Sequence, residues 1–97
     1  MAKLTQNEIA EQLKAVSGWE YADNAIAKLF RFKQFMDGIR FINEVATIAE
    51  AADHHPDIHV NYTRVRMVCT THDAGGVTAK DLLLAGEIER TYTSRPA

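Results

Sequence analysis

The sequence predicts an α+β domain in which three helices cover one face of a four-stranded antiparallel sheet, in the order αββαββα. Two observations predict this class. Apolar residues recur at three- and four-residue steps in three segments, which is typical of helices with one buried face. Apolar and polar residues alternate in four shorter segments, and short turn signals separate these segments into two hairpins.

The first helix is predicted over residues 6–16. Its start is marked by the segment Thr5-Gln-Asn-Glu8, which has the spacing of a capping box, and its end by Ser17-Gly18. Two strands follow, over 19–22 and 26–33. They meet at Asp23-Asn24, a pair that favours a tight turn, and therefore form the first hairpin.

The second helix is predicted over 34–51, because its apolar residues follow a helical period: Phe35, Ile39, Ile42, Val45, Ala46 and Ala49. Gly38 costs this helix about 1 kcal/mol relative to alanine, which indicates a close contact with another element. Pro56 disfavours helical geometry at the preceding residue, so the helix ends before His55.

Alternation returns over 57–61 and 64–71, and Tyr62-Thr63 joins these two strands into a second hairpin. Residues 73–76 form a loop. Thr78 can cap a last helix that ends near residue 92, and the residues expected to face inward are Leu82, Ala85, Gly86 and Ile88.

Composition sets limits on function. The chain has 97 residues, of which 46% are hydrophobic and 25% charged, so we expect one soluble domain over 1–97. It has no apolar run of membrane-spanning length and no signal peptide pattern. A net charge of −2 with scattered basic residues argues against nucleic-acid binding. The single cysteine, Cys69, favours a cytoplasmic protein and lies where a buried, inert thiol is expected.

The histidines are the unusual feature. Three of the four lie within Glu50–His59, and His72 follows later. If Tyr62 and Thr63 are the two turn residues, paired positions in the second hairpin sum to 125. Asp53 then faces His72 and His54 faces Thr71, with Cβ atoms about 4.5–5.5 Å apart in directly opposed pairs. The sequence therefore predicts that these side chains converge.

Other residues point to the same end of the sheet. The carboxyl end of the second helix, together with Glu50 and Asp53, favours protonated imidazoles. Gly75 and Gly76 let the backbone approach a bound molecule. Each feature also has a simpler interpretation, since Asp81 can complete a helix cap and Trp19 is typical of a core. We expect His59 to be exposed or packed rather than functional.

These residues resemble one known family, pterin-4a-carbinolamine dehydratase. The matching pattern is dense from Glu50 to Ala85 and consists of Glu50, His54-His55-Pro56, Tyr62, Val65, Thr71-His72, Gly75-Gly76, Thr78 and Asp81. A looser likeness extends over the whole chain, including Gly18-Trp19. Ile58 stands where many members have an aromatic residue, and His59 is not part of the pattern.

The resemblance implies an αββαββα fold and dehydration of a 4a-hydroxytetrahydropterin to the quinonoid dihydropterin. This reaction recycles the cofactor of aromatic amino acid hydroxylases and needs neither metal nor cofactor. It also implies a homodimer or homotetramer. The catalytic residues would be His54, His55 and His72, and the substrate-binding residues Glu50, Asp53, Asp81, Trp19, Thr71 and Gly75.

The chemistry suggests a division of roles. Loss of water needs one group to protonate the hydroxyl and another to accept a ring-nitrogen proton, and histidine serves both roles near neutral pH. We expect His54 and His72 to take these roles in an order that the sequence leaves open. His55 points away from His54 on an extended chain and would hold the substrate.

Two alternatives of different classes remain. His54 and His72 with Asp53 or Glu50 could bind zinc or iron, although the sequence has no H-E-x-x-H or paired C-x-x-C spacing. Alternatively, the second helix or an exposed sheet edge could bind another protein, because the family includes members that bind the dimerisation helices of a transcription factor.

Overall fold

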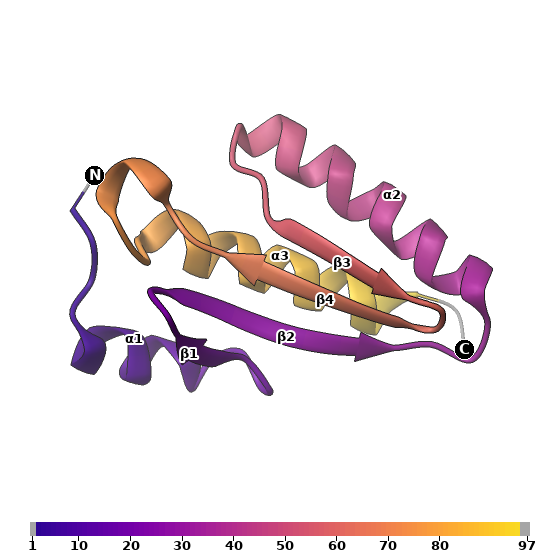
Figure 1. The fold of residues 1–97 in the computed structure, drawn as a ribbon, viewed down its shortest axis with the longest axis horizontal. Coiled ribbons are helices and arrows are strands. Elements are labelled where there is room, and N and C mark those ends of the chain that lie inside the picture. The colour runs from indigo at the N-terminus through magenta and orange to yellow at the C-terminus, as the bar shows by residue number, and fades with distance from the viewer. Residues whose placement is uncertain (1, 96–97) are drawn as a thin grey trace.

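The computed structural model describes residues 2–95 and has the α+β class that the sequence predicts (Figure 1). Four antiparallel strands form one open sheet, and three α-helices accompany it. The elements in chain order are α1 (Gln6–Leu13), β1 (Glu20–Ala22), β2 (Ala25–Arg31), α2 (Phe35–Ala52), β3 (Asp57–Asn61), β4 (Arg64–Cys69), the short 3₁₀ turn η1 (His72–Ala74) and α3 (Ala79–Ser94).

The strand order is β1-β2-β4-β3, so the two hairpins join through their second strands. β2 pairs with β4 from Ile26 opposite Cys69 to Arg31 opposite Arg64. β3 pairs with β4 from Asn61 opposite Arg64 to Asp57 opposite Val68, which is the register predicted from the Tyr62-Thr63 turn. The edges of the sheet are β1 and β3.

Both hairpin turns use backbone conformations with positive φ. Asp23 and Asn24 have φ of +53° and +61°, as a two-residue type I′ turn requires, so the predicted tight turn is confirmed. Tyr62 has φ of +52° at the tip of the second hairpin. A tyrosine in this left-handed region is uncommon, and the surrounding strand pairing fixes it there.

One face of the sheet carries the core, since inward-facing residues of β2 and β4 cluster with buried residues from all three helices. Phe30 lies at the centre of the aromatic part of this core. Its ring centroid is 4.9 Å from that of Tyr92, 5.1 Å from that of Phe41 and 6.0 Å from that of Trp19. α2 and α3 are thereby fixed over the sheet, and their ends determine where the polar side chains lie.

Gly38 marks the close contact that the sequence indicated. It is buried, and a Cβ atom placed on it would lie 3.3 Å from Val65 Cγ2 and 3.4 Å from the Phe32 ring. The first turns of α2 therefore pass close to β4 and to Phe32. This close approach explains why the helix carries a residue of poor helix propensity.

Some details differ from the sequence predictions. α1 ends at Leu13 rather than residue 16, because the backbone tightens into three-residue steps such as Val16 N–H to Leu13 O at 3.1 Å. Phe35 is 44% exposed, since the buried stripe of α2 begins one turn later at Gly38. In α3, Leu84 is buried in the core, whereas Leu82, expected to face inward, is only partly buried.

Cys69 is fully buried on β4, as predicted for an inert thiol. Burial raises the pKa of its thiol from 9.0 to about 12, and the negative charges of Asp81 and Asp57 act in the same direction. None of the helices within residues 2–95 is both long enough and apolar enough to cross a membrane.

The raised pKa of Cys69 predicts that the folded protein resists alkylation. At pH 8.5 the unfolded thiol is partly ionised, whereas the folded thiol keeps its proton, so iodoacetamide should label Cys69 in urea and only very slowly without it. Intact-mass spectrometry over time measures both rates. Equal labelling rates with and without urea would contradict the burial of Cys69.

The same shift in the pKa of Cys69 means that the free energy of unfolding falls as the pH rises above 9, because only the unfolded thiol ionises there.

Candidate active site

The carboxyl end of α2 positions His54 through backbone hydrogen bonds. Asp53 follows the last helical residue in the left-handed conformation, with φ of +50°. The Asp53 N–H donates to the carbonyl of Glu50 at 3.2 Å, and the His54 N–H donates to that of Ala49 at 3.1 Å. These two bonds form a Schellman motif, which ends the helix and turns the chain toward β3.

The imidazole of His54 meets the carboxylate of Asp81. Nε2 of His54 lies 2.6 Å from Oδ1 of Asp81, which comes from the first turn of α3. The Asp81 side chain is fully buried, and that of His54 is 12% exposed. His54 and Asp81 are 27 residues apart in sequence, and their contact joins the end of α2 to the start of α3.

The second oxygen of Asp81 is also fully occupied. Oδ2 accepts hydrogen bonds from the Thr71 hydroxyl at 2.8 Å and from the Thr78 N–H at 2.9 Å. The hydroxyls of Thr71 and Thr78 lie 2.9 Å apart, and the Thr78 hydroxyl accepts from the Lys80 N–H at 3.3 Å. A buried carboxylate needs such partners, because an unpaired buried charge is strongly unfavourable.

This network determines which nitrogen of His54 carries hydrogen. A carboxylate only accepts hydrogen bonds, so Nε2 of His54 donates to Oδ1 of Asp81. In the neutral ring the lone pair is then on Nδ1, and this atom can take up or release a proton.

Thr71 opens a compact loop that holds His72. The Thr71 N–H donates to Gly76 O at 3.0 Å, and Thr71 O accepts from the N–H groups of Ala74 and Gly75, both at 3.0 Å. Gly75 has φ of +74°, and no atom lies within 4 Å of a Cβ placed on it. The loop is therefore closed by backbone bonds and has open space beside Gly75.

His72 itself is exposed at the start of η1. It follows Thr71 directly, so its Cα lies about 3.8 Å from that of Thr71. Since Thr71 and His54 bond the same carboxylate, residues 54 and 71 meet at Asp81 across the second hairpin. The structure brings Thr71, Asp81 and His54 together, whereas His72 follows Thr71 in the chain and is exposed.

His55 pairs with a different acid. Its Nε2 is in contact with a carboxylate oxygen of Glu50, one turn back in α2. The two side chains are 53% and 78% exposed, so the pair is open to solvent. His54 and His55 therefore differ in environment, one joined to a buried carboxylate and the other at the surface.

The comparisons with known proteins agree on one family. The family model described as "Pterin 4 alpha carbinolamine dehydratase" matches residues 2–91. The chain belongs to the pterin-4a-carbinolamine dehydratase family. A provisionally named dehydratase of this family from Gloeobacter violaceus is 49% identical over 92 residues, covering 91% of this chain and all of that protein. Another from Sulfurisphaera tokodaii is 43% identical over 93 residues, covering 96% of this chain and all of that protein.

Two solved structures share the fold. One is described as a transcriptional coactivator/pterin dehydratase from Brucella melitensis. It has a TM-score of 0.89 and 36% identity, over 93% of this chain and 98% of that one. The other is described as a pterin dehydratase-like protein that acts as a RuBisCO assembly factor in the alpha-carboxysome. Its TM-score is 0.65 over 79% of this chain and 89% of that one, and at 17% identity it shows the fold alone.

Trp19 lies apart from the histidines within this chain. Its side chain is 5% exposed, and its Nε1–H donates to Glu89 Oε1 at 2.9 Å. Glu89 is eight residues beyond Asp81 on α3, a rise of about 12 Å along the helix. Lys28 pairs with the same Glu89 oxygen and donates to Ser17 O at 2.8 Å. Trp19 and Lys28 thus join β1 and β2 to α3 through Glu89. A contact between Trp19 and the substrate stays a prediction.

Thr78, predicted as a helix cap and as part of the family pattern, is an additional site residue. It does cap α3, in a capping box with Asp81. Its hydroxyl also extends the hydrogen-bond chain through Thr71 to the carboxylate. The T-x-x-D spacing was the available signal, but only the fold shows that the same aspartate reaches His54.

No group of three or more His, Cys, Asp or Glu side chains within residues 2–95 is arranged to hold a metal ion. The acids nearest to the histidines are instead used in pairs, Asp81 with His54 and Glu50 with His55. The ligand set that was considered for zinc or iron, His54 and His72 with Asp53 or Glu50, is therefore not assembled in the described part of this family member.

The left-handed conformation of Asp53 predicts a specific pattern of stabilities. Asp53→Gly should keep or raise the free energy of unfolding by up to about 1 kcal/mol, because glycine adopts positive φ without strain. Asp53→Val should lower it by about 1–2 kcal/mol. Urea unfolding of both variants measures the difference, and Asp53→Asn separates the loss of charge from the backbone effect. Equal stability of the Gly and Val variants would contradict this role for Asp53.

Proposed function

We propose that this chain is a 4a-hydroxytetrahydropterin dehydratase, which removes water from the carbinolamine and thereby recycles the pterin of aromatic amino acid hydroxylases. The observation that supports this most is the His54–Asp81 pair, a partly exposed imidazole held by a fully buried carboxylate. Family membership supports the substrate class. The pterin is the substrate, and the proposed reaction uses only protein side chains.

The reaction moves two protons and breaks one bond. The C4a–O bond breaks and the oxygen leaves as water once a general acid has protonated it, because hydroxide is a poor leaving group. A ring nitrogen releases its proton to a general base, and the freed electron pair forms the new C=N bond. Groups with pKa values near ambient pH serve both steps best, and each typically contributes about 10²–10⁴-fold.

His54 suits one of these two steps. With Nε2–H committed to Asp81, the ring exchanges its proton at Nδ1, and the carboxylate keeps the ring in this orientation. His72 takes the other step in this proposal. It follows Thr71, whose hydroxyl bonds the same carboxylate, and its exposed ring is accessible to a bound pterin.

The remaining predicted residues are assigned to binding. The exposed His55–Glu50 pair would hold the pterin or its hydroxyl, and Asp53 lies between them in the helix-ending turn. Carboxylates suit the pyrimidine edge of a pterin, which presents N–H donors. The open space at Gly75 would let the backbone approach the flat ring. Thr71 acts through Asp81 in this scheme rather than through direct contact.

The proposal predicts a large and selective loss of turnover. His54→Ala and His72→Ala should each lower the rate by about 10²–10⁴-fold, because each removes one proton-transfer group. Asp81→Asn should lower it as well, since the amide cannot stabilise the imidazolium. Stopped-flow absorbance of freshly prepared 4a-hydroxytetrahydropterin measures the rate.

His59→Ala is the matched control. His59 is exposed on β3, and its side chain points to the face of the sheet opposite the core. It should dehydrate the substrate at the wild-type rate. Circular dichroism should show that all variants remain folded. Wild-type turnover in His54→Ala or His72→Ala would rule out the assignment.

We also propose that copies of the chain associate, through the open edge at β3. This edge strand presents unpaired backbone groups, and Val60 on it is 46% exposed. Sedimentation equilibrium should give a dimer or tetramer, and Val60→Lys should shift it toward the monomer. A monomer at all accessible concentrations would exclude self-association.

Binding of another protein is the second candidate function. Phe35 and Met36 on the first turn of α2 are 44% and 51% exposed, which provides an apolar surface for a helical partner. The Brucella relative is described both as a coactivator and as a dehydratase, so the two roles are compatible. A chain that lacks pterin turnover but binds helical peptides would favour the second function.

We also propose that the protein acts in the cytoplasm.

A further inference from the structure

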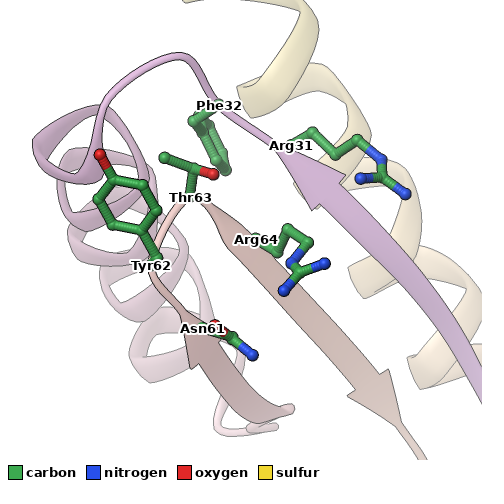
Figure 2. A pocket seen from close by; sticks show the side chains of 6 residues that line it. All are labelled: Arg31, Phe32, Asn61, Tyr62, Thr63 and Arg64. Carbon is green, nitrogen blue, oxygen red and sulfur yellow. The ribbon is translucent and has the colours of Figure 1, made fainter.

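The end of the sheet away from the histidines carries a pocket that the proposed reaction does not use. It has a volume of about 370 Å³ and lies where β2 ends and β3 turns into β4 (Figure 2). Its lining residues are Arg31, Phe32, Asn61, Tyr62, Thr63 and Arg64. Two of the six are arginines and none is an acid, so the lining carries a net positive charge.

Strand register places the two arginines side by side. Arg31 of β2 is directly opposite Arg64 of β4, and Asn61 of β3 is opposite Arg64 on its other side. All three therefore project from one face of the sheet, and Figure 2 shows both guanidinium groups extending to the same side. Their Cβ atoms are about 4.5–5.5 Å apart across each strand pair.

This arrangement is unfavourable without an anion. Like charges that are directly opposed in an antiparallel pair destabilise it. Arg66, two residues along β4 on the same face, adds a third cation, and His59 is its partner on β3. Within residues 2–95, no carboxylate lies within 4.0 Å of these three arginines, as the ion pairs of that region involve other cations.

The acids of the neighbourhood do not compensate this charge. On the same face, Glu20 and Asp57 lie in the row of Val68, four residues from Arg64 and about 13 Å along the strand. That separation exceeds the screening length of about 8 Å at physiological salt. The adjoining groove, which shares Arg31, contains two carboxylates, Asp37 and Glu44. Asp37 pairs with Arg40, and the groove also contains Lys33 and Arg95, so its cations outnumber its acids.

The backbone around the arginines is held firmly. The Phe32 N–H donates to Thr63 O at 2.9 Å, which joins the two walls of the pocket just beyond the paired arginines. The Tyr92 hydroxyl from α3 donates to Arg31 O, also at 2.9 Å. The backbone positions from which the arginine side chains project are therefore fixed, so less freedom is lost when these side chains bind a small ligand.

From this geometry we propose that Arg31, Arg64 and Asn61 form a binding site for a small oxyanion with two negative charges. Arginine forks match the oxygens of phosphate and carboxylate groups bidentately, and the Asn61 amide supplies a neutral donor beside them. Arg66 raises the local positive potential. The site lies on the open face of the sheet, at the opposite end from His54, and is independent of the proposed dehydration.

Thermal unfolding in phosphate, succinate and chloride at matched ionic strength tests the site. Phosphate or succinate should raise the Tm of the wild type above its value in chloride, because a ligand of the folded state stabilises it. The better of the two dianions identifies the preferred group. Titration of the 15N-labelled protein with the same anion should shift the amide signals of residues 31 and 61–64.

Variants make the test specific. Arg31→Gln and Arg64→Gln should weaken binding at least tenfold, yet in chloride they should be as stable as the wild type or more so, since the repulsion is relieved. Arg64→Lys keeps the positive charge but lacks the guanidinium group that binds bidentately, so it should bind the anion with intermediate affinity. Arg90→Gln, on the exposed surface of α3, is the matched control and should bind like the wild type. The proposal is wrong if neither dianion stabilises the wild type, or if both glutamine variants respond as the wild type does.

Discussion

The buried carboxylate of Asp81 is the constraint on which the histidine site depends. Burying a charge is unfavourable unless every acceptor position has a donor, and here the donors come from three parts of the chain. The Thr78 N–H belongs to the start of α3, the Thr71 hydroxyl to the end of the second hairpin, and His54 to the turn after α2. Satisfying one side chain therefore fixes the relative positions of a helix start, a helix end and a loop.

The same requirement explains why the imidazole is held so closely. The Schellman motif orients the His54 backbone, and the carboxylate then fixes its ring. The proton-transfer role that we propose for His54 needs this kind of support, because small errors of position would lower its efficiency. The His54–Asp81 pair lies where the end of α2 meets the start of α3, so the geometry of this pair is set by the fold.

Much of the fold could be predicted from the sequence, because local signals specify it. The capping residues, the Asp23-Asn24 turn and the alternation of the strands each have a local physical cause, and the Tyr62-Thr63 turn alone fixes the register of β3 and β4. That register predicted that residues 54 and 71 lie close together, and both bond the carboxylate of Asp81. The face of α2 was less well predicted, since Phe35 fits the helical period yet lies before the first buried turn.

What the sequence did not reveal depends on contacts across the sheet. In the sequence, Arg31 and Arg64 are two of several scattered basic residues, and only the pairing of β2 with β4 brings them into one row. Register within a hairpin follows from its turn, whereas the pairing of two separate hairpins has no local signal. The role of Trp19 was hidden for the same reason, because its partner Glu89 is 70 residues away.

The two ends of the sheet can therefore vary independently. The histidine end depends on Asp81 and its donors, and the opposite end depends on the β2–β4 register, with no residue common to both. A relative could retain the sheet and helices while losing either set of side chains. This is consistent with a common fold in proteins described as a dehydratase and as an assembly factor. Under the proposed function, activity in such a family would follow from the side chains around one buried carboxylate rather than from the fold that holds them.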